Sequence, residues 1–265
     1  MHVTAGISSF SVNGKTEGVG VKEGAGCWIY LSALTEEENE VVISMDNNNN
    51  ETVIIKKVGQ TKYTVTVDGT ATEVEEGAEY KFGDNLQGYY DTTNNVAYAP
   101  NTSIKVNGDL NIKSIKLNVA MAKGASIRLA DPTGLRFQTV ITSGNDLSLD
   151  EILNNGTVIK TGTIITTSTI LGENGVVNDE FVKDDSKLKL DITNSGWYEN
   201  TTGTFCGSIV KLNKVNYGTD FVGVGYVTIK YNNAEKTEKT IYASVETKGD
   251  NVRSASTVAK KVQKS

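Results

Sequence analysis

The sequence predicts a mainly β protein, with two small β modules in tandem followed by a β-sandwich-like domain that carries a short C-terminal helix. Strand-forming Thr, Val, Ile and Tyr recur in short runs, and Asn, Gly and Asp separate these runs as turn residues. Hydrophobic residues make up 38% of the 265 residues, which is enough for ordinary cores. This length fits two or three domains or one large β domain, and the pattern along the chain favours three modules.

The first predicted module covers residues 1–60. The polar run Asp46 to Asn50 is expected to be the turn of a hairpin between its last two strands. Trp28 lies in the apolar segment from Gly26 to Leu31, and we expect its side chain in the core. The strands of this module are predicted at 7–12, 27–34, 41–45 and 52–58.

The second predicted module covers residues 61–113. It opens with an alternating strand from Tyr63 to Val67, which ends at the hairpin dipeptide Asp68-Gly69. Further strands are predicted at 79–82, 88–90, 96–98 and 103–106. The alternation breaks between Ile112 and Ile115, three residues apart, so we expect a bulge or a new domain near residue 114.

The third predicted module covers residues 114–265 and is the largest. A short helix is expected after Ser148, because Ser148 and Glu151 form a capping box and Ile152 and Leu153 supply an apolar face. Strands are predicted at 115–121, 125–129, 135–141, 158–166, 188–192, 204–210, 222–231 and 240–244.

A second helix is predicted at the C-terminus, capped by Asp250. Its apolar side would consist of residues with helical spacing, Val252, Ala255, Ala259 and Val262. Lysines follow at the end where the helix dipole favours cations, Lys260, Lys261 and Lys264.

The charge of the chain argues against two classes of partner. It has 26 basic and 32 acidic residues and a net charge of −6, whereas a nucleic-acid-binding protein needs a clustered basic face. No run of about 18 apolar residues exists, so we expect no membrane insertion. Strand-like sequence begins at once, without a signal peptide. We therefore expect an excised, monomeric fragment of a secreted or cell-wall-attached protein.

The residues needed for common catalytic sites are scarce. His2 is the only histidine, which excludes Ser-His-Asp triads, Cys-His dyads and nearly every zinc site. Cys27 and Cys206 fall in different predicted modules; two separate buried thiols are favoured, and a disulfide stays open. We expect no enzyme, no cofactor and no metal. A carboxylate glycosidase, and calcium at Asp46 or at Asn178-Asp179-Glu180, are the remaining alternatives.

Aromatic residues in polar stretches are the first candidates for ligand binding. Trp197 and Tyr198 lie in a polar stretch between two predicted strands, and Tyr89 and Tyr90 lie in a similar stretch of the second module. Exposed rings can stack on sugars or anchor a protein interface. The alternative is a ring that packs over the edge of the core. We favour this core role for Tyr89 and Tyr90. For Trp197 and Tyr198 we weigh the core role and the binding role equally.

Arginine is the second candidate, because the chain otherwise uses lysine. Two of its three arginines, Arg128 and Arg136, lie in the segment from Gly124 to Phe137. Guanidinium can hold a carboxylate through two parallel bonds, which lysine cannot do. We favour a structural role, such as pairing with Asp131 or Asp220 or bracing the loop 131–134. The alternative is a guanidinium pair that faces an acidic sugar or a carboxylate of a partner.

These same residues carry a resemblance. Ala125-Ser126-Ile127-Arg128 and Pro132-Thr133-Gly134-Leu135-Arg136-Phe137 resemble a domain found in large surface proteins of gut-dwelling Gram-positive bacteria. Later segments with the same likeness lie at 205–210, 221–227, 241–242, 253–254 and 258–259. The second module resembles small β repeats of cell-wall-attached adhesins, in Val74 to Tyr80 and Gly88 to Asp91.

The resemblance implies a non-catalytic extracellular binding module and supplies no site residues. We expect a superantigen-like adhesin that engages a host protein. The most specific form of this expectation is that the host protein is an immunoglobulin and that its variable domain is bound. Such binding can use the pairing of edge strands. The alternatives are a carbohydrate-binding module of a surface polysaccharide-utilisation protein and a structural spacer.

Overall fold

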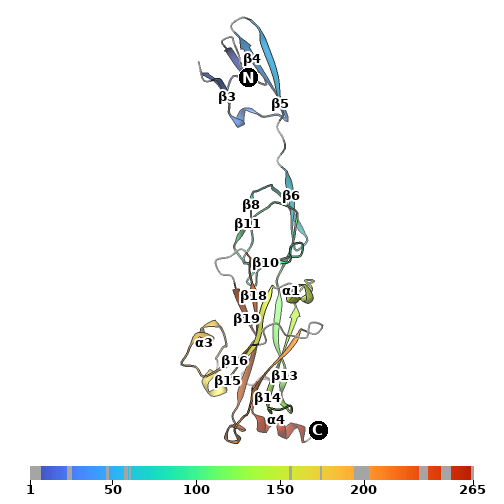
Figure 1. The fold of residues 1–265 in the computed structure, drawn as a ribbon, viewed down its shortest axis with the longest axis vertical. Coiled ribbons are helices and arrows are strands. Elements are labelled where there is room, and N and C mark those ends of the chain that lie inside the picture. Colours follow the sequence, from blue (N-terminus) through green and yellow to red (C-terminus); the bar gives the residue numbers. More distant parts are fainter. Residues whose placement is uncertain are drawn as a thin grey trace. The chain divides into compact units, whose positions relative to one another are not determined.

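The computed structural model of the chain describes residues 7–22, 26–45, 48–56, 59, 61–154, 157–173, 175–193, 203–232, 238–245 and 252–263. The fold is mainly β, as predicted, with 52% strand and 12% helix (Figure 1). The chain separates into two compact units, residues 1–61 and residues 62–265.

The N-terminal unit contains two small antiparallel sheets. The larger sheet has the order β1 (Ile7–Val12), β4 (Glu38–Met45), β5 (Asn50–Lys56). The smaller pairs β2 (Val19–Lys22) with β3 (Gly26–Ile29), and the turn η1 (Leu31–Ala33) follows. Alternate residues of β1 and β4 face inward and form the core, which consists of Phe10, Val12, Val41 and Ile43.

The first part of the second unit, residues 62–114, is called here the small β region. Its main sheet has the order β10-β9-β12-β6-β7, and β8 pairs with β11 beside it. The pair β12 and β6 is parallel, whereas the other pairs are antiparallel. The bounds are β6 (Lys62–Val67), β7 (Thr70–Glu75), β8 (Glu79–Lys81), β9 (Tyr89–Asp91), β10 (Val96–Tyr98), β11 (Ser103–Lys105) and β12 (Leu110–Ser114).

The predicted hairpin of the small β region is present, and an aromatic core lies beside it. Asp68 and Gly69 both have positive φ, 47° and 85°, as a tight two-residue hairpin between β6 and β7 requires. The core is built around Phe82, whose ring stacks on Tyr89 at 5.1 Å and on Tyr98 at 5.0 Å between centroids. Val65 and Ile112, from the two parallel strands, are fully buried in the same core.

The second part of this unit, residues 115–263, is called here the sandwich region. One sheet has the order β13 (Leu117–Arg128), β14 (Gly134–Ser143), β17 (Thr204–Val210). The other has the order β16-β15-β18-β19, with β20 also paired to β18. Its strands are β15 (Val158–Thr167), β16 (Leu190–Thr193), β18 (Phe221–Lys230), β19 (Glu238–Tyr242) and β20 (Val252–Arg253).

Glycines bring the two sheets of the sandwich close together. A β-carbon placed on Gly223 of β18 would lie 2.7 Å from the β-carbon of Phe137 on β14, and nearer still to its ring. Gly225 meets Thr139 in the same way. The motif Gly-Val-Gly in β18 therefore serves packing, because only glycine leaves room for the facing side chains.

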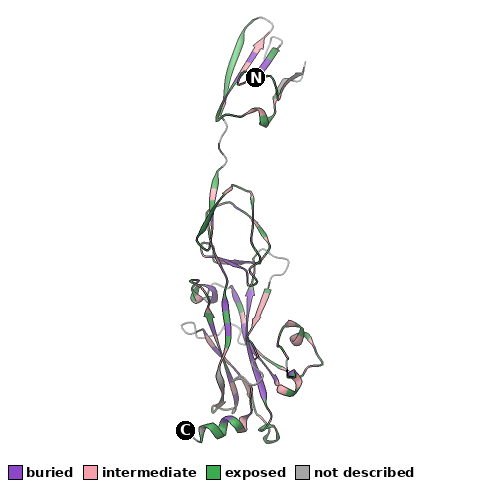
Figure 2. Ribbon diagram, turned by 180° about the vertical axis from the view of Figure 1, so that it is seen from behind, coloured by how far each residue is buried: buried purple, intermediate pink, exposed green. Residues whose placement is uncertain are grey.

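Both faces of β18 are covered, so that nine of its ten residues are buried (Figure 2). Its inward face packs on β14, as described above. On its outward face Val222, Val224 and Tyr226 belong to the same apolar cluster as Leu171 and Val177 from the segment that connects β15 to β16. This covering segment, residues 168–189, contains α2 (Ser168–Leu171) and α3 (Asp179–Lys183).

The remaining helices are short and partly as predicted. The helix expected after Ser148 is α1 (Leu149–Asn154), and Ile152 and Leu153 are buried as its apolar face. The turn η2 (Lys214–Asn216) precedes β18. The C-terminal helix α4 (Ala255–Val262) begins later than predicted, because Ser254 caps it by accepting from the backbone N–H of Thr257 at 3.1 Å. Val252 belongs to β20, and Asp250 lies outside the described residues.

Near the predicted boundary at residue 114, β12 ends at Ser114 and β13 starts at Leu117, but residues 62–265 form one compact unit. The two regions nevertheless share a core, in which Tyr90 and Ala97 join Ile115 and Leu117. A double hydrogen bond adds to this. The Leu117 backbone N–H donates to Oε1 of Gln87 at 2.6 Å, and Gln87 Nε2 donates to the Leu117 carbonyl at 3.0 Å. The Tyr231 hydroxyl also donates to the Gln87 carbonyl at 2.9 Å. The regions are therefore joined by specific contacts.

Candidate functional site

The tyrosines proposed as ligand-stacking residues are buried. Tyr90 is fully buried, and its hydroxyl donates to Asn95 Oδ1 at 3.0 Å and to the Glu151 carbonyl at 3.2 Å. Tyr89 stacks on Phe82 in the core of the small β region. In this structure neither ring offers a face to a sugar, and both have the core role that the sequence analysis favoured.

The two arginines lie on the partly exposed outer face of the sheet β13-β14-β17. Nη1 of Arg128 donates to the carbonyls of Ala130 and Pro132, so this guanidinium braces the loop between β13 and β14. Arg136 lies opposite Ser126 and Ser208 on the neighbouring strands. The bracing role proposed for the segment 131–134 thus falls to Arg128, through backbone carbonyls.

The thiol of Cys206 is half-buried next to Arg136. Burial raises its pKa above the ordinary value, and the positive charge of Arg136 opposes that rise. A raised pKa keeps the thiol protonated at neutral pH, which makes it a poor nucleophile. The side chain of Cys27, and the whole of Trp197 and Tyr198, lie outside the described residues.

An exposed aromatic group lies where the sequence analysis expected core. Trp28 was predicted to be buried, and this is wrong: its side chain is 44% exposed, followed by Tyr30 at 61% and Leu31 at 84%. Trp28 belongs to the two-stranded sheet β2-β3, which packs on the core through Val19 and through Ile29, the residue between the two aromatics. Alternation predicts which residues share a face of a strand, but it does not say whether anything covers that face.

These three residues, Trp28, Tyr30 and Leu31, are called here the aromatic patch. Backbone geometry fixes its form, because Tyr30 continues the extended conformation of β3 with φ −73° and ψ 141°. Residues two apart in extended backbone project to the same side, so both rings leave the same face. The Trp28 ring lies over Gly20 of the paired strand, where a β-carbon would come within 2.9 Å of Cη2 and closer to other ring atoms.

A strand edge in the same unit is also exposed. In the described part of the chain β5 pairs only with β4. Six of its seven residues are exposed, among them Val53 and Ile54. An edge strand with apolar side chains can accept a further strand from another chain.

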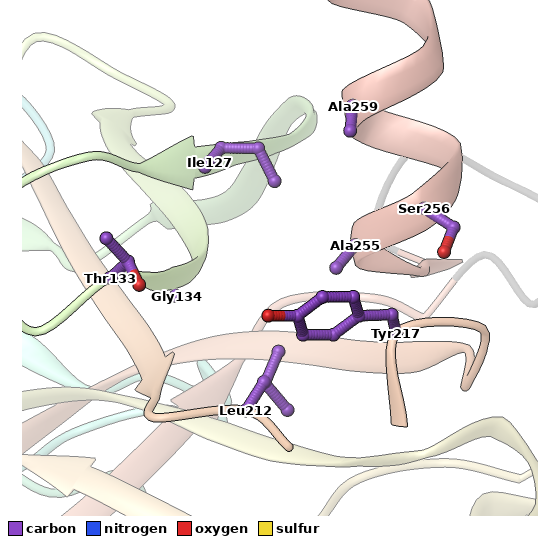
Figure 3. Close-up of a pocket in the computed structure, with 8 residues that line it drawn as sticks. All are labelled: Ile127, Thr133, Gly134, Leu212, Tyr217, Ala255, Ser256 and Ala259. Atoms are coloured by element: carbon purple, nitrogen blue, oxygen red, sulfur yellow. The ribbon is translucent and has the colours of Figure 1, made fainter. Parts of the chain in front are cut away.

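A pocket of about 310 Å³ lies in the sandwich region beside α4 (Figure 3). The Tyr217 ring stands between Leu212 and Ala255, and its hydroxyl points toward Thr133 and Gly134. The remaining lining residues are Ile127, Ser256 and Ala259. The lining is uncharged and its polar side-chain groups are hydroxyls, so it supplies no acid–base pair for catalysis.

Carboxylates and tyrosines meet on the outer face of the second sheet of the sandwich. The Tyr226 hydroxyl donates to Asp191 Oδ1 at 2.7 Å, and Lys160 Nζ lies 3.3 Å from Asp191 Oδ2. The Tyr242 hydroxyl donates to Asp179 Oδ1 at 2.9 Å. Burial raises the pKa of Tyr226 and of Tyr242, so both stay protonated donors. The bond from Tyr242 to Asp179 attaches the covering segment to the sheet, whereas Asp191 belongs to β16 and its bonds join strands within the sheet.

The candidate calcium ligands at residues 178–180 have local roles. Asn178 caps α3 by accepting from the Phe181 N–H at 2.9 Å, and Asp179 accepts from Tyr242. Among the described residues no three His, Cys, Asp or Glu side chains gather as a metal site. The other candidate, Asp46, lies outside the described residues. None of the helices in the described part of the chain has the length and apolar character to cross a bilayer.

Comparisons of the chain with models of known protein families, with curated proteins and with solved structures find no match.

Proposed function

We propose that this chain is a non-catalytic binding module of a bacterial surface protein, and that it engages a partner protein through the aromatic patch of its N-terminal unit. The observation that carries the proposal is the exposure of Trp28, Tyr30 and Leu31 side by side in sequence. Tryptophan and tyrosine are the residues that most often dominate the energy of protein interfaces.

The surroundings of the patch favour a protein partner with basic groups. Glu36, Glu37 and Glu38 begin three residues after the end of η1 and are exposed, and Glu38 also pairs with Lys56 at 2.6 Å. An apolar centre with a charged rim is the usual composition of a protein interface. Acidic groups at the rim would attract lysine and arginine of the partner and speed association at low salt.

The β5 edge offers a second, separate binding element in the same unit. A strand of the partner could pair with β5 through backbone hydrogen bonds and cover Val53 and Ile54. Immunoglobulin domains are themselves β-sandwiches with edge strands, and an immunoglobulin variable domain is our specific proposal for the partner. The location at the bacterial surface rests on the sequence resemblance of the segments 125–128 and 132–137.

A carbohydrate-binding module is the second candidate, and one observation favours it. The Trp28 ring is seated on Gly20 and is partly open to solvent, which is the arrangement of a stacking platform for a sugar ring. Tyr89 and Tyr90, the other rings considered for this role, lie in the core.

The test is capture by the immobilised full chain from human serum and mucosal secretions, followed by affinity measurement with the protein retained. We expect Trp28→Ala to weaken binding by about 30-fold or more, which corresponds to a contact of about 2 kcal/mol. Tyr217→Ala is the matched control, because Tyr217 is 43% exposed but lies in the other unit.

Each result has a distinct meaning. Loss of binding in Trp28→Ala, with Tyr217→Ala unchanged, supports the patch. Equal affinity of both variants for the captured protein would place the contact elsewhere and reject the patch. If no protein is retained while a glycan array is positive and sensitive to Trp28→Ala, the carbohydrate function replaces the first proposal.

A further inference from the structure

The two strands that begin and end the small β region lie next to each other. β6 begins at Lys62, β12 ends at Ser114, and the two pair in parallel, with Leu110 opposite Val65 and Ile112 opposite Val67. The chain therefore enters this pair at one end and leaves it at the opposite end.

This topology decides how tension acts on the region. Pulling on the two ends of the chain draws β6 toward Lys62 and β12 toward Ser114, so the strands must slide past each other along their axes. All hydrogen bonds between them then carry load together. In a pair whose pulled ends lie at the same end of the ladder, the bonds instead break one after another.

Carboxylates extend the contact at both ends of the pair. At one end Asp109 Oδ1 accepts from the Thr64 backbone N–H at 2.7 Å. At the other end Asp68 accepts from the Ser114 backbone N–H at 2.8 Å and from its hydroxyl at 2.5 Å. Hydrogen bonds to charged groups are about twice as strong as neutral ones. These bonds add to the ladder and resist the same sliding motion.

The position of the pair protects it from water. β6 and β12 are the inner strands of the sheet, flanked by β7 on one side and β9 on the other. Val65 and Ile112 are fully buried beneath them. Water therefore has little access to the inner face of the pair, whereas the Asp109 bond to Thr64 lies on the exposed side.

The segment that follows β12 is also held. The Ile115 N–H donates to the Gly88 carbonyl at 2.9 Å, and Asn85 Nδ2 donates to the Ile115 carbonyl at 3.2 Å. With the paired Gln87 and Leu117, these bonds tie the connection to the sandwich region. Tension from the sandwich region therefore reaches β12 through a connection that is held by hydrogen bonds.

We propose that β6, β12, Asp68 and Asp109 form a load-bearing clamp, whose function is to keep the small β region folded while the chain is under tension. This function is separate from the binding proposed for the N-terminal unit and does not depend on the identity of a partner. Forced unfolding is governed by the unfolding barrier and not by the equilibrium stability, so the two quantities can be separated by experiment.

The first experiment compares two directions of pulling on the full chain by single-molecule force spectroscopy. Handles at the two termini load the clamp in shear. Handles at the N-terminus and at the exposed Asn107, attached through a click-reactive amino acid, peel β6 from β12 at the Asp109 end. In the terminal geometry unfolding of Lys62 to Ser114 releases about 180 Å of contour length, less its folded end-to-end distance. We expect a several-fold lower rupture force in the peeling geometry.

The second experiment uses variants in the terminal geometry. Asp109→Ala removes the carboxylate hydrogen bond at one end of the pair. Asp68→Gly removes the carboxylate hydrogen bonds at the other end, and glycine tolerates the positive φ at this position. The matched control is Asp91→Ala, because the Asp91 carboxylate also accepts three hydrogen bonds, but only from Thr93 and Asn94 in a local turn. We expect the clamp variants to lower the rupture force and the control to lower mainly the thermal stability.

Two results would overturn the clamp. One is equal rupture force in the shear and peeling geometries, which would mean that strand direction is irrelevant. The other is a loss of force in Asp91→Ala as large as in the clamp variants, which would mean that the force only follows overall stability.

Discussion

Replacement of Gly223 by alanine tests whether glycine sets the distance between the two sheets of the sandwich. The new β-carbon would lie 2.7 Å from the β-carbon of Phe137, inside the 3.0 Å below which real β-carbons essentially never approach other atoms. Phe137 is fully buried at the centre of its own cluster, so its ring has little freedom to move aside. Because a rotamer change moves the ring of Phe137 but not its β-carbon, the two sheets must separate locally.

The expected cost follows from the chemistry of overpacking. Adding a methyl group to a well-packed core costs about 1–3 kcal/mol. For a unit of this size, each 1 kcal/mol lowers the melting temperature by about 2–4 °C. We therefore expect Gly223→Ala to lower the melting temperature of the second unit by about 2–12 °C, measured by scanning calorimetry.

The control for this substitution is Gly218→Ala. A β-carbon there would have no atom within 4 Å, and Gly218 has no positive φ that an alanine would strain. Such a change is expected to be neutral or slightly stabilising. A double-mutant cycle with Phe137→Ala should show a favourable coupling of about 1 kcal/mol, because alanine lacks the two ring atoms, Cγ and Cδ1, that overlap the new methyl group most closely. Equal melting temperatures of Gly223→Ala and Gly218→Ala would refute the reasoning.

Two further substitutions have defined outcomes. Burial raises the pKa of Tyr231 from 10.0 to about 12. The folded state therefore favours the neutral phenol of Tyr231. The contribution of this phenol to stability is complete below pH 10 and is lost as the pH rises toward 12. Tyr231→Phe should lower the unfolding free energy by about 1 kcal/mol at pH 7. Between pH 10 and 12 the unfolding free energy of this variant, measured by denaturant titration, should fall less steeply than that of the parent chain. An equally steep fall in both would show that Tyr231 does not titrate in this range. Arg128→Lys should lower the melting temperature, because an ammonium group cannot reproduce the guanidinium contacts with Ala130 and Pro132. The affinity for the partner should stay unchanged. Lost affinity at unchanged stability would instead assign Arg128 to a binding surface.

Local patterns predicted those elements whose cause is local. The strand 204–210 was predicted with the bounds that the structure has, and the hairpin at Asp68-Gly69 follows from the two residues that best tolerate positive φ. The helix α1 follows from its capping box and apolar face. In each of these elements the residues that decide the structure are neighbours in the chain.

Elements defined by partners far along the chain were missed or altered. β7 was not predicted, because its sequence Thr-Ala-Thr-Glu-Val-Glu is polar and exposed and is a strand only through its pairing with β6. The strands expected at 115–121 and 125–129 are one strand, β13, with a register shift between Met121 and Ala125. A break in alternation signals an irregularity but does not distinguish a bulge from a turn.

The candidate site was harder to predict for a related reason. Trp28 and Tyr90 both lie among strand residues. Tyr90 is buried, and its hydroxyl donates to Asn95 and to Glu151 of α1, whereas Trp28 is partly exposed on the outer face of its sheet. Which of the two rings is exposed depends on what the rest of the chain places over it. The parallel pairing of β6 with β12 likewise joins residues that are 45 positions apart in sequence, such as Val65 and Leu110, and leaves no local pattern.

The covering segment 168–189 bears on the solubility of the whole second unit. β18 is apolar on both faces, as is usual for strands in the middle layer of a protein but not for an antiparallel sheet with one face in water. Without its cover, Val222 and Val224 would form an exposed β-rich apolar strip, which is the composition that promotes self-association. The bond from Tyr242 to Asp179 holds this cover on the sheet and therefore acts against aggregation. Changes in residues 168–189 that alter length or charge are constrained by this protective role, even though the segment lies far from the aromatic patch in sequence.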